Sequence, residues 1–155
     1  MRPVTLERAS LDAMHAHGRA EHPDECCGAI VEAHGRDVVH RFTNVQNQLH
    51  ADNPAENPRD AKMAYAPEPK ELFAVIRAGE QPGCRLKVFY HSHAVRGSYF
   101  SGEDRARAMF GEDPAYPDVT YVVVSDAREP AEARAFRWSD EAQDFVEVPI
   151  EVHEP

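Results

Sequence analysis

Residues 86–104 read LKVFYHSHAVRGSYFSGED, and the rest of the chain is organised around them. Its first five residues form an apolar run with β-branched and aromatic members, which predicts a strand. Because alternate residues of a strand point to the same side, His91 and His93 should present two imidazoles on one face at the strand's end. After a loop, Ser101 begins a helical segment, and Asp104 lies in its first turn. Two nitrogen ligands, one carboxylate and an open fourth position are typical of a catalytic zinc site.

A simpler interpretation of the same residues competes with the metal site. The spacing Ser101-x-x-Asp104 is also that of a helix capping box, in which each side chain bonds the other residue's backbone N–H. A carboxylate turned toward a metal cannot fully close that box, so the two interpretations of Asp104 compete. A His-x-His pair alone can be only a polar strand face, and an isolated Glu25 only a solvated carboxylate at a strand end. The joint spacing of these residues favours the metal.

Composition and charge narrow the possible functions. The chain has 155 residues, a length typical of one domain, and 42% of them are hydrophobic. No apolar run approaches the roughly 18–20 residues of a membrane span, and the N-terminus lacks the apolar core of a signal peptide. We therefore expect a cytoplasmic protein with no membrane partner. The net charge of −10 argues against nucleic acid as a partner.

The three cysteines indicate neither a disulfide framework nor a thiolate zinc site. Their number is odd, two of them are adjacent, and no Cys-x-x-Cys pair occurs. Cys26 and Cys27 lie in an apolar run, so we expect buried, unreactive thiols.

The remaining patterns predict an α/β domain with a mixed sheet flanked by helices. Thr5 is expected to cap a first helix, on which His15 and His17 should lie at the surface. Residues 46–69 are rich in Asn, Asp, Pro and Ala and show little periodicity, which predicts a long flexible loop. We interpret it as a flap beside the active site, and a disordered bulge is the alternative. Helices are expected at 5–19, 68–78 and 101–110, and strands at 26–31, 38–45, 85–91, 119–125, 133–138 and 145–152.

These residues together resemble a known family motif. Glu25, then His91-Ser92-His93, then Ser101 after seven intervening residues, then Asp104 is similar to the JAMM (MPN-plus, JAB) metalloprotease motif, E…H-S/T-H-x7-S-x2-D. The resemblance extends over about residues 5–150 and implies a single domain spanning 1–155 with the MPN/JAB, cytidine-deaminase-like sandwich. The compact form is most similar to bacterial members that act on ubiquitin-like sulfur-carrier proteins.

The resemblance implies a role for each motif residue. His91, His93 and Asp104 would bind one Zn²⁺, Glu25 would be the general base, and Ser101 would help to hold the oxyanion. The implied activity is that of a zinc-dependent peptidase or isopeptidase that cleaves after the C-terminal Gly-Gly of a ubiquitin-like partner of the ThiS or MoaD type. The loop after His93 lacks the proline often seen in the family and carries Arg96 instead, for which we hypothesise a contact with a substrate carboxylate.

Two other functional classes deserve comparison. The family contains members that keep the fold and lose the metal ligands, so a non-catalytic MPN-type scaffold for a protein partner is the alternative; the complete motif argues against it. A nucleobase deaminase would need His-x-Glu with Pro-Cys-x-x-Cys, and both are absent. The particular partner and the oligomeric state stay open, and a homodimer is possible.

Overall fold

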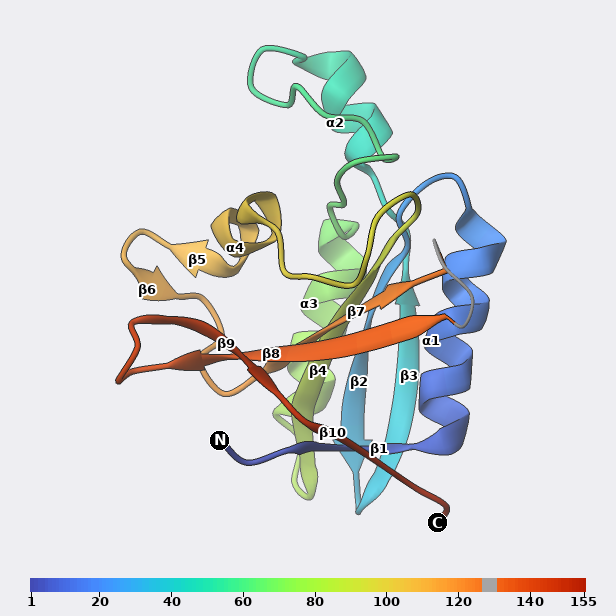
Figure 1. Ribbon diagram of the computed structural model, residues 1–155, viewed down its shortest axis with the longest axis vertical. Helices are drawn as coiled ribbons and strands as arrows, with labels where there is room; N and C mark the ends of the chain where they lie inside the picture. Colours follow the sequence, from blue (N-terminus) through green and yellow to red (C-terminus); the bar gives the residue numbers. More distant parts are fainter. Residues whose placement is uncertain (127–130) are drawn as a thin grey trace.

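The computed structural model describes residues 1–126 and 131–155, and its centre is a six-stranded mixed sheet (Figure 1). The strand order is β3-β2-β4-β7-β8-β9, and the pairing is antiparallel everywhere except between β4 and β7. This confirms the predicted α/β class with a mixed sheet. The strands are β2 (Cys27–Ala33), β3 (Arg36–Phe42), β4 (Cys84–His93), β7 (Thr120–Ser125), β8 (Glu132–Ser139) and β9 (Asp144–Val148).

Helices pack on both faces of this sheet. Helix α1 (Arg8–Glu21) contributes Met14 to a core that contains Ile30, whereas α3 (Pro69–Gly79) contributes Val75 to a second core that contains Ala29. Neighbouring residues of a strand point to opposite faces, so Ala29 and Ile30 place the two helices on opposite sides of β2. The molecule is therefore layered as helix, sheet, helix.

The first and last segments of the chain pair with each other. Strand β1 (Val4–Glu7) lies parallel to β10 (Ile150–His153), with Thr5 opposite Glu151. The prediction that Thr5 caps a helix is wrong, because Val4 and Leu6 alternate with it into the core and the helix begins only at Arg8.

The predicted last strand, 145–152, is divided at Pro149. Strand β9 ends before this residue and β10 begins after it. Proline has no N–H to donate to a strand ladder, which explains the break. Its carbonyl oxygen still accepts from the Val4 N–H at 2.9 Å, so the break leads directly into the pairing with β1.

The segment 46–69 is more regular than its sequence indicates. Residues Gln46–Asp52 form helix α2, which projects from the rest of the molecule at the top of Figure 1. Side-chain amides hold the residues that follow: Gln46 Nε2 donates to the Arg59 carbonyl at 2.8 Å, and the Ala61 N–H donates to Asn47 Oδ1 at 2.8 Å. The expectation of a loop without secondary structure is thus wrong for its first seven residues, and flexibility of the remainder stays a prediction.

The segment after the histidines forms a short helix and a small ribbon. Helix α4 (Gly102–Ala108) ends two residues before the predicted boundary, and β5 (Met109–Phe110) pairs with β6 (Asp113–Pro114). Within the part of the chain that the structure describes, no helix is long and apolar enough to cross a membrane.

Candidate metal centre

His91 and His93 lie at the end of β4, in the middle of the sheet. Residues 89, 91 and 93 of a strand point to the same face, and Phe89 packs in the core under α3. Both imidazoles therefore point to that face, and the prediction that they share a face is confirmed. Each histidine is only 1% exposed. Because β2 and β7 flank β4 on either side, the backbone that carries the two rings is held rigidly.

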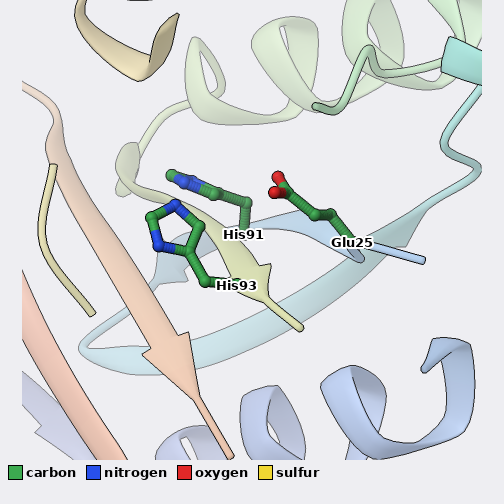
Figure 2. Close-up of side chains that lie close together, drawn as sticks. All are labelled: Glu25, His91 and His93. Carbon is green, nitrogen blue, oxygen red and sulfur yellow. The ribbon is translucent and has the colours of Figure 1, made fainter. Parts of the chain in front are cut away.

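Glu25 joins the two histidines from a distant part of the sequence (Figure 2). Its carboxylate oxygen and the ring nitrogens of His91 and His93 all lie within 4.8 Å of one another. Two backbone contacts fix its position just before β2: the Glu25 N–H donates to the Ala61 carbonyl at 2.7 Å, and Asn44 Nδ2 donates to the Glu25 carbonyl at 2.8 Å. The loop before α3 therefore takes part in building this cluster.

Asp104 closes the capping box and faces both histidines at once. Its backbone N–H donates to Ser101 Oγ at 3.1 Å, and its Oδ2 accepts from the Ser101 N–H at 3.0 Å. The same carboxylate lies 3.1 Å from His91 Nε2 through Oδ1 and 3.1 Å from His93 Nε2 through Oδ2. Asp104 thus closes the capping box while its carboxylate faces both rings, because a carboxylate oxygen has more than one lone pair to share; the competition with a metal stays a prediction.

The donor atoms fit a divalent metal ion. Glu25 Oε1 and His91 Nε2 are buried and have no hydrogen-bond partner among residues 1–126 and 131–155; the contact of His91 with Asp104 lies outside hydrogen-bonding geometry. Unpaired buried polar atoms are costly, so they indicate a group that binds there. Two ligands about 2.1 Å from a tetrahedral ion lie about 3.4 Å apart. The 3.1 Å separations and the mixed nitrogen and oxygen donors match that arrangement.

Contacts behind the two rings orient them. His93 Nδ1 lies 2.7 Å from the carbonyl oxygen of Gly97, an acceptor that suits a proton on Nδ1, and a neutral ring in that tautomer would offer the Nε2 lone pair to a metal ion. Tyr65 stacks on the His91 ring with centroids 4.4 Å apart. The loop after β4 and the segment after α2 thus hold one histidine each.

Burial and neighbouring charges set the protonation of the cluster. Burial, together with the Asp104 carboxylate, raises the pKa of Glu25 to about 8, although Arg96 opposes the shift. Burial also lowers the pKa of His91, against the pull of Asp104, so this ring is neutral. Burial by itself would raise the pKa of Asp104, but the His91 and His93 contacts and the Ser101 N–H hold it below its usual range. The ionised carboxylate of Asp104 therefore faces the neutral ring of His91. The carboxyl group of Glu25 is able to exchange a proton near neutral pH.

The structure brings all the residues predicted for the site to one place. The sequence did not indicate two of their neighbours, Tyr65 and the Met63 carbonyl, because nothing in a proline-rich segment marks which residue turns inward. Arg96 is closer than expected: its Nη2 lies 3.2 Å from Glu25 Oε2 and 3.4 Å from the Met63 carbonyl. The charge of Arg96 was visible in the sequence, but its partner was not.

An apolar pocket of about 310 Å³ adjoins the His91 side of the cluster. Tyr65 lines it and also stacks on His91, so one ring separates the pocket from the donor atoms. Aromatic side chains such as Phe89 and the strongly exposed Phe110 form much of the wall, and Arg107 contributes a charge. These walls suit apolar groups.

Comparison with known proteins agrees with this site. Residues 7–139 match the family described as prokaryotic homologs of the JAB domain. The chain belongs to this family. The match begins before α1 and ends in β8, so this JAB domain includes Glu25, both histidines, Ser101 and Asp104.

Curated relatives of this JAB protein are peptidases by description. Proteins of Mycobacterium tuberculosis and Mycobacterium bovis described as CysO-cysteine peptidase are 34% identical over 154 residues, which cover 97% of this chain and 92% of each relative. A desampylase of Haloferax volcanii is 27% identical over 129 residues and covers 79% of this chain and 80% of its own.

Solved structures share the fold. The solution structure of a Desulfitobacterium hafniense protein has a TM-score of 0.72 at 20% identity and covers 98% of this chain and 94% of its own. A Salinibacter ruber protein has a TM-score of 0.59 at 23% identity, with 98% and 92% covered. Together with the match to the JAB family, this agrees with the fold predicted from the motif.

Proposed function

We propose that this JAB protein is a zinc-dependent peptidase or isopeptidase that cleaves after the C-terminal Gly-Gly of a ubiquitin-like protein. The observation that carries the proposal is the convergence of His91, His93 and Asp104, with Glu25 beside them. Two of these polar atoms have no hydrogen-bond partner among the residues that the structure describes. The relatives described as CysO-cysteine peptidase and desampylase support a small protein modifier as the substrate.

Each residue has a defined task in this hydrolysis. His91, His93 and Asp104 would hold Zn²⁺, which polarises a carbonyl and acidifies water when bound. Glu25 accepts the proton that the attacking water loses and delivers it to the leaving nitrogen, for which a pKa near neutrality is well suited. Ser101 Oγ accepts from the Asp104 N–H, so its own hydroxyl hydrogen stays available for the oxyanion.

The recessed position of the site explains a preference for glycine. Glu25, His93 and Asp104 are each at most 2% exposed, so a polypeptide must approach closely to reach them. Glycine has no side chain, and its backbone can enter where other residues would collide. The apolar pocket next to His91 would bind residues that precede the two glycines.

The test combines metal content with turnover. Zinc is measured by elemental analysis, and the zinc-loaded protein is incubated with a Gly-Gly-tailed ubiquitin-like sulfur-carrier protein that carries a one-residue C-terminal extension. We expect about one zinc per chain and a mass loss equal to the extension. Glu25→Gln should keep the zinc and lose about 10²- to 10⁴-fold in rate.

Two results would contradict the proposal. If the zinc-loaded wild type binds the ubiquitin-like partner but does not cleave it, the protein is a non-catalytic scaffold. If Glu25→Gln trims as fast as wild type, proton transfer does not pass through this carboxylate.

A further inference from the structure

Arg96 lies beside Glu25 in the proposed active centre. It belongs to the loop that follows β4, and its Nη2 contacts Glu25 Oε2 at 3.2 Å. The guanidinium is held from two other directions: the Met63 carbonyl accepts from Nη2 at 3.4 Å, and the ring of Tyr99 lies under it with the centroid 5.7 Å from Cζ. Its side chain is 15% exposed, so it is largely enclosed and yet reachable.

The two sides of the centre differ in character. The apolar pocket adjoins His91 through Tyr65, whereas Tyr99 packs edge-on against His93 with centroids 5.3 Å apart. A tail that approaches through the pocket therefore places its leaving group toward the loop that carries Arg96. Val95 and Tyr99 are strongly exposed there, at 67% and 45%, so that side opens to solvent.

Proton delivery fixes where the leaving group must be. Glu25 can protonate the leaving nitrogen only from within hydrogen-bond distance, about 2.6–3.2 Å. In an α-amino acid one carbon separates that nitrogen from the carboxylate, so the two groups lie roughly 3 Å apart. The Arg96 guanidinium, which contacts Glu25, is then positioned to bind the carboxylate while Glu25 protonates the leaving nitrogen.

We propose that Arg96 recognises the free α-carboxylate of the leaving amino acid, so that the preferred substrate is a Gly-Gly tail extended by a single residue. This inference rests on the proposed function. A planar guanidinium with several donors is suited to a carboxylate, which it binds through parallel charge-assisted hydrogen bonds. The Tyr99 and Met63 contacts hold it in place beforehand, so little conformational freedom is lost on binding.

Other conjugates lack the group that Arg96 binds. A lysine side chain joined to the tail carries no carboxylate near its ε-nitrogen, and a longer extension has a neutral amide where the single residue has its charge. In the reaction the glycyl C–N bond breaks, the water oxygen joins the carbonyl carbon, and Glu25 carries one proton to the nitrogen. The second proton of the water passes from the newly formed glycine carboxyl group to the amine, so the released amino acid leaves with its ammonium group beside Glu25 and its carboxylate on Arg96.

A matched pair of substrates tests this inference. A Gly-Gly-tailed ubiquitin-like sulfur-carrier protein is extended by one alanine and prepared as the free acid and as the C-terminal carboxamide. With the zinc-loaded wild type, kcat/KM should be at least about tenfold higher for the acid, the effect of one charge-assisted hydrogen bond. In Arg96→Gln the ratio should fall to within about twofold of one, and in Arg96→Lys it should be intermediate.

The ratio separates recognition from a purely structural role. Loss of the contact with Glu25 alters both rates together and leaves their ratio unchanged. Arg107→Gln is the matched control, because Arg107 lies over Tyr65 on the pocket side, 5.5 Å from the ring centroid, and its removal should keep the wild-type ratio. The metal-free wild type, which does not turn over, should bind the acid more tightly than the carboxamide in calorimetry.

Several results would overturn the inference. If wild type cleaves the acid and the carboxamide at equal rates, the inference is wrong and the proposed function stays intact. The same holds if Arg96→Gln keeps the acid-to-carboxamide ratio of the wild type. If Arg96→Gln does not fold, the ratio in Arg96→Lys decides in the same way. If wild type cleaves neither protein, the proposed function fails and this inference fails with it.

Discussion

Strand β4 carries two buried polar clusters, and they differ in how completely their atoms are paired. In its first half, Lys87 Nζ donates to Asp37 Oδ1 at 2.7 Å and to Glu32 Oε2 at 3.3 Å, and Asp37 Oδ2 accepts from the Glu7 N–H at 2.9 Å. At its other end, the cluster around His91 leaves a ring nitrogen and an oxygen of Glu25 without a hydrogen-bond partner within the described ranges.

This difference separates a structural cluster from a functional one. Both clusters are buried: the side chains of Lys87 and Asp37 are 3% and 2% exposed, and those of His91 and Asp104 are 1% and 2%. Burial and charge alone therefore do not distinguish them. Buried polar groups are normally satisfied, so the unpaired atoms are the ones that call for a ligand.

The largest expected effect comes from breaking the satisfied cluster. Lys87→Met leaves the buried Asp37 carboxylate without its cation, and we expect a loss of about 3–5 kcal/mol in the free energy of unfolding. Urea denaturation measures this loss. The proposed cleavage rate per folded molecule should not change, because Lys87 is remote from the centre along β4.

A neighbouring substitution provides the control for Lys87. Arg85 also pairs with Glu32, at 3.2 Å, but its side chain is 58% exposed. Arg85→Met should cost at most about 1 kcal/mol, as is usual for surface ion pairs. If both variants were equally stable, burial of the Lys87 pair would not be what holds this cluster together.

A substitution at Ser101 tests the other cluster, the one around His91. Ser101→Ala removes both the hydroxyl proposed for the oxyanion and the cap of α4. We expect kcat to fall by about 10²- to 10³-fold. The free energy of unfolding should fall by about 1 kcal/mol.

A second substitution at Ser101 separates the two losses. Glycine is nearly as good a helix cap as serine, at a cost of only about a few tenths of a kcal/mol, but it has no side-chain donor for the oxyanion, so Ser101→Gly should keep most of the stability and not the rate. Thermal unfolding and single-turnover cleavage measure the two quantities. A wild-type rate in Ser101→Gly would mean that Ser101 acts only as a cap.

His17 offers a third, smaller test, because it is a buried histidine that has a partner. Its Nδ1 lies 2.7 Å from the Tyr90 hydroxyl on the α1 face of β4, and the residue is 2% exposed. Burial, with a small contribution from Arg41, lowers its pKa from 6.5 to about 4. The unfolded chain thus takes up this proton near pH 6.5, whereas the folded chain resists it until about pH 4.

The stability that His17 contributes should therefore be complete above pH 6.5 and decline as the pH falls toward 4. Between these pH values, the free energy of unfolding of His17→Gln should fall by about 1–3 kcal/mol less than that of the wild type. Denaturation of the metal-free protein at successive pH values measures this difference. Parallel curves for wild type and variant would show that His17 is protonated in the folded state as easily as in the unfolded one.

The local features of the fold were predictable from the sequence. The alternation of residues 86–93 places both histidines on one face, and the Ser101-x-x-Asp104 spacing predicts the cap that the structure contains. Where prediction fails, a partner distant in the sequence decides. Thr5 lies in a strand because β10 pairs with it, and His17 is buried because Tyr90 reaches it. Helix α2 has the mainly polar sequence QNQLHAD, which offers no apolar stripe to detect.

Spacing along the sequence was enough to predict the relative positions of the proposed ligands, because His91 and His93 share one strand face and Asp104 follows Ser101 in one helical turn. The groups that surround these residues depend on tertiary packing. Glu25 reaches them because β2 pairs with β4, and Arg96 reaches Glu25 because the loop after β4 folds over the centre. Periodicity describes neighbours within one element, whereas contacts between elements depend on how the whole chain packs.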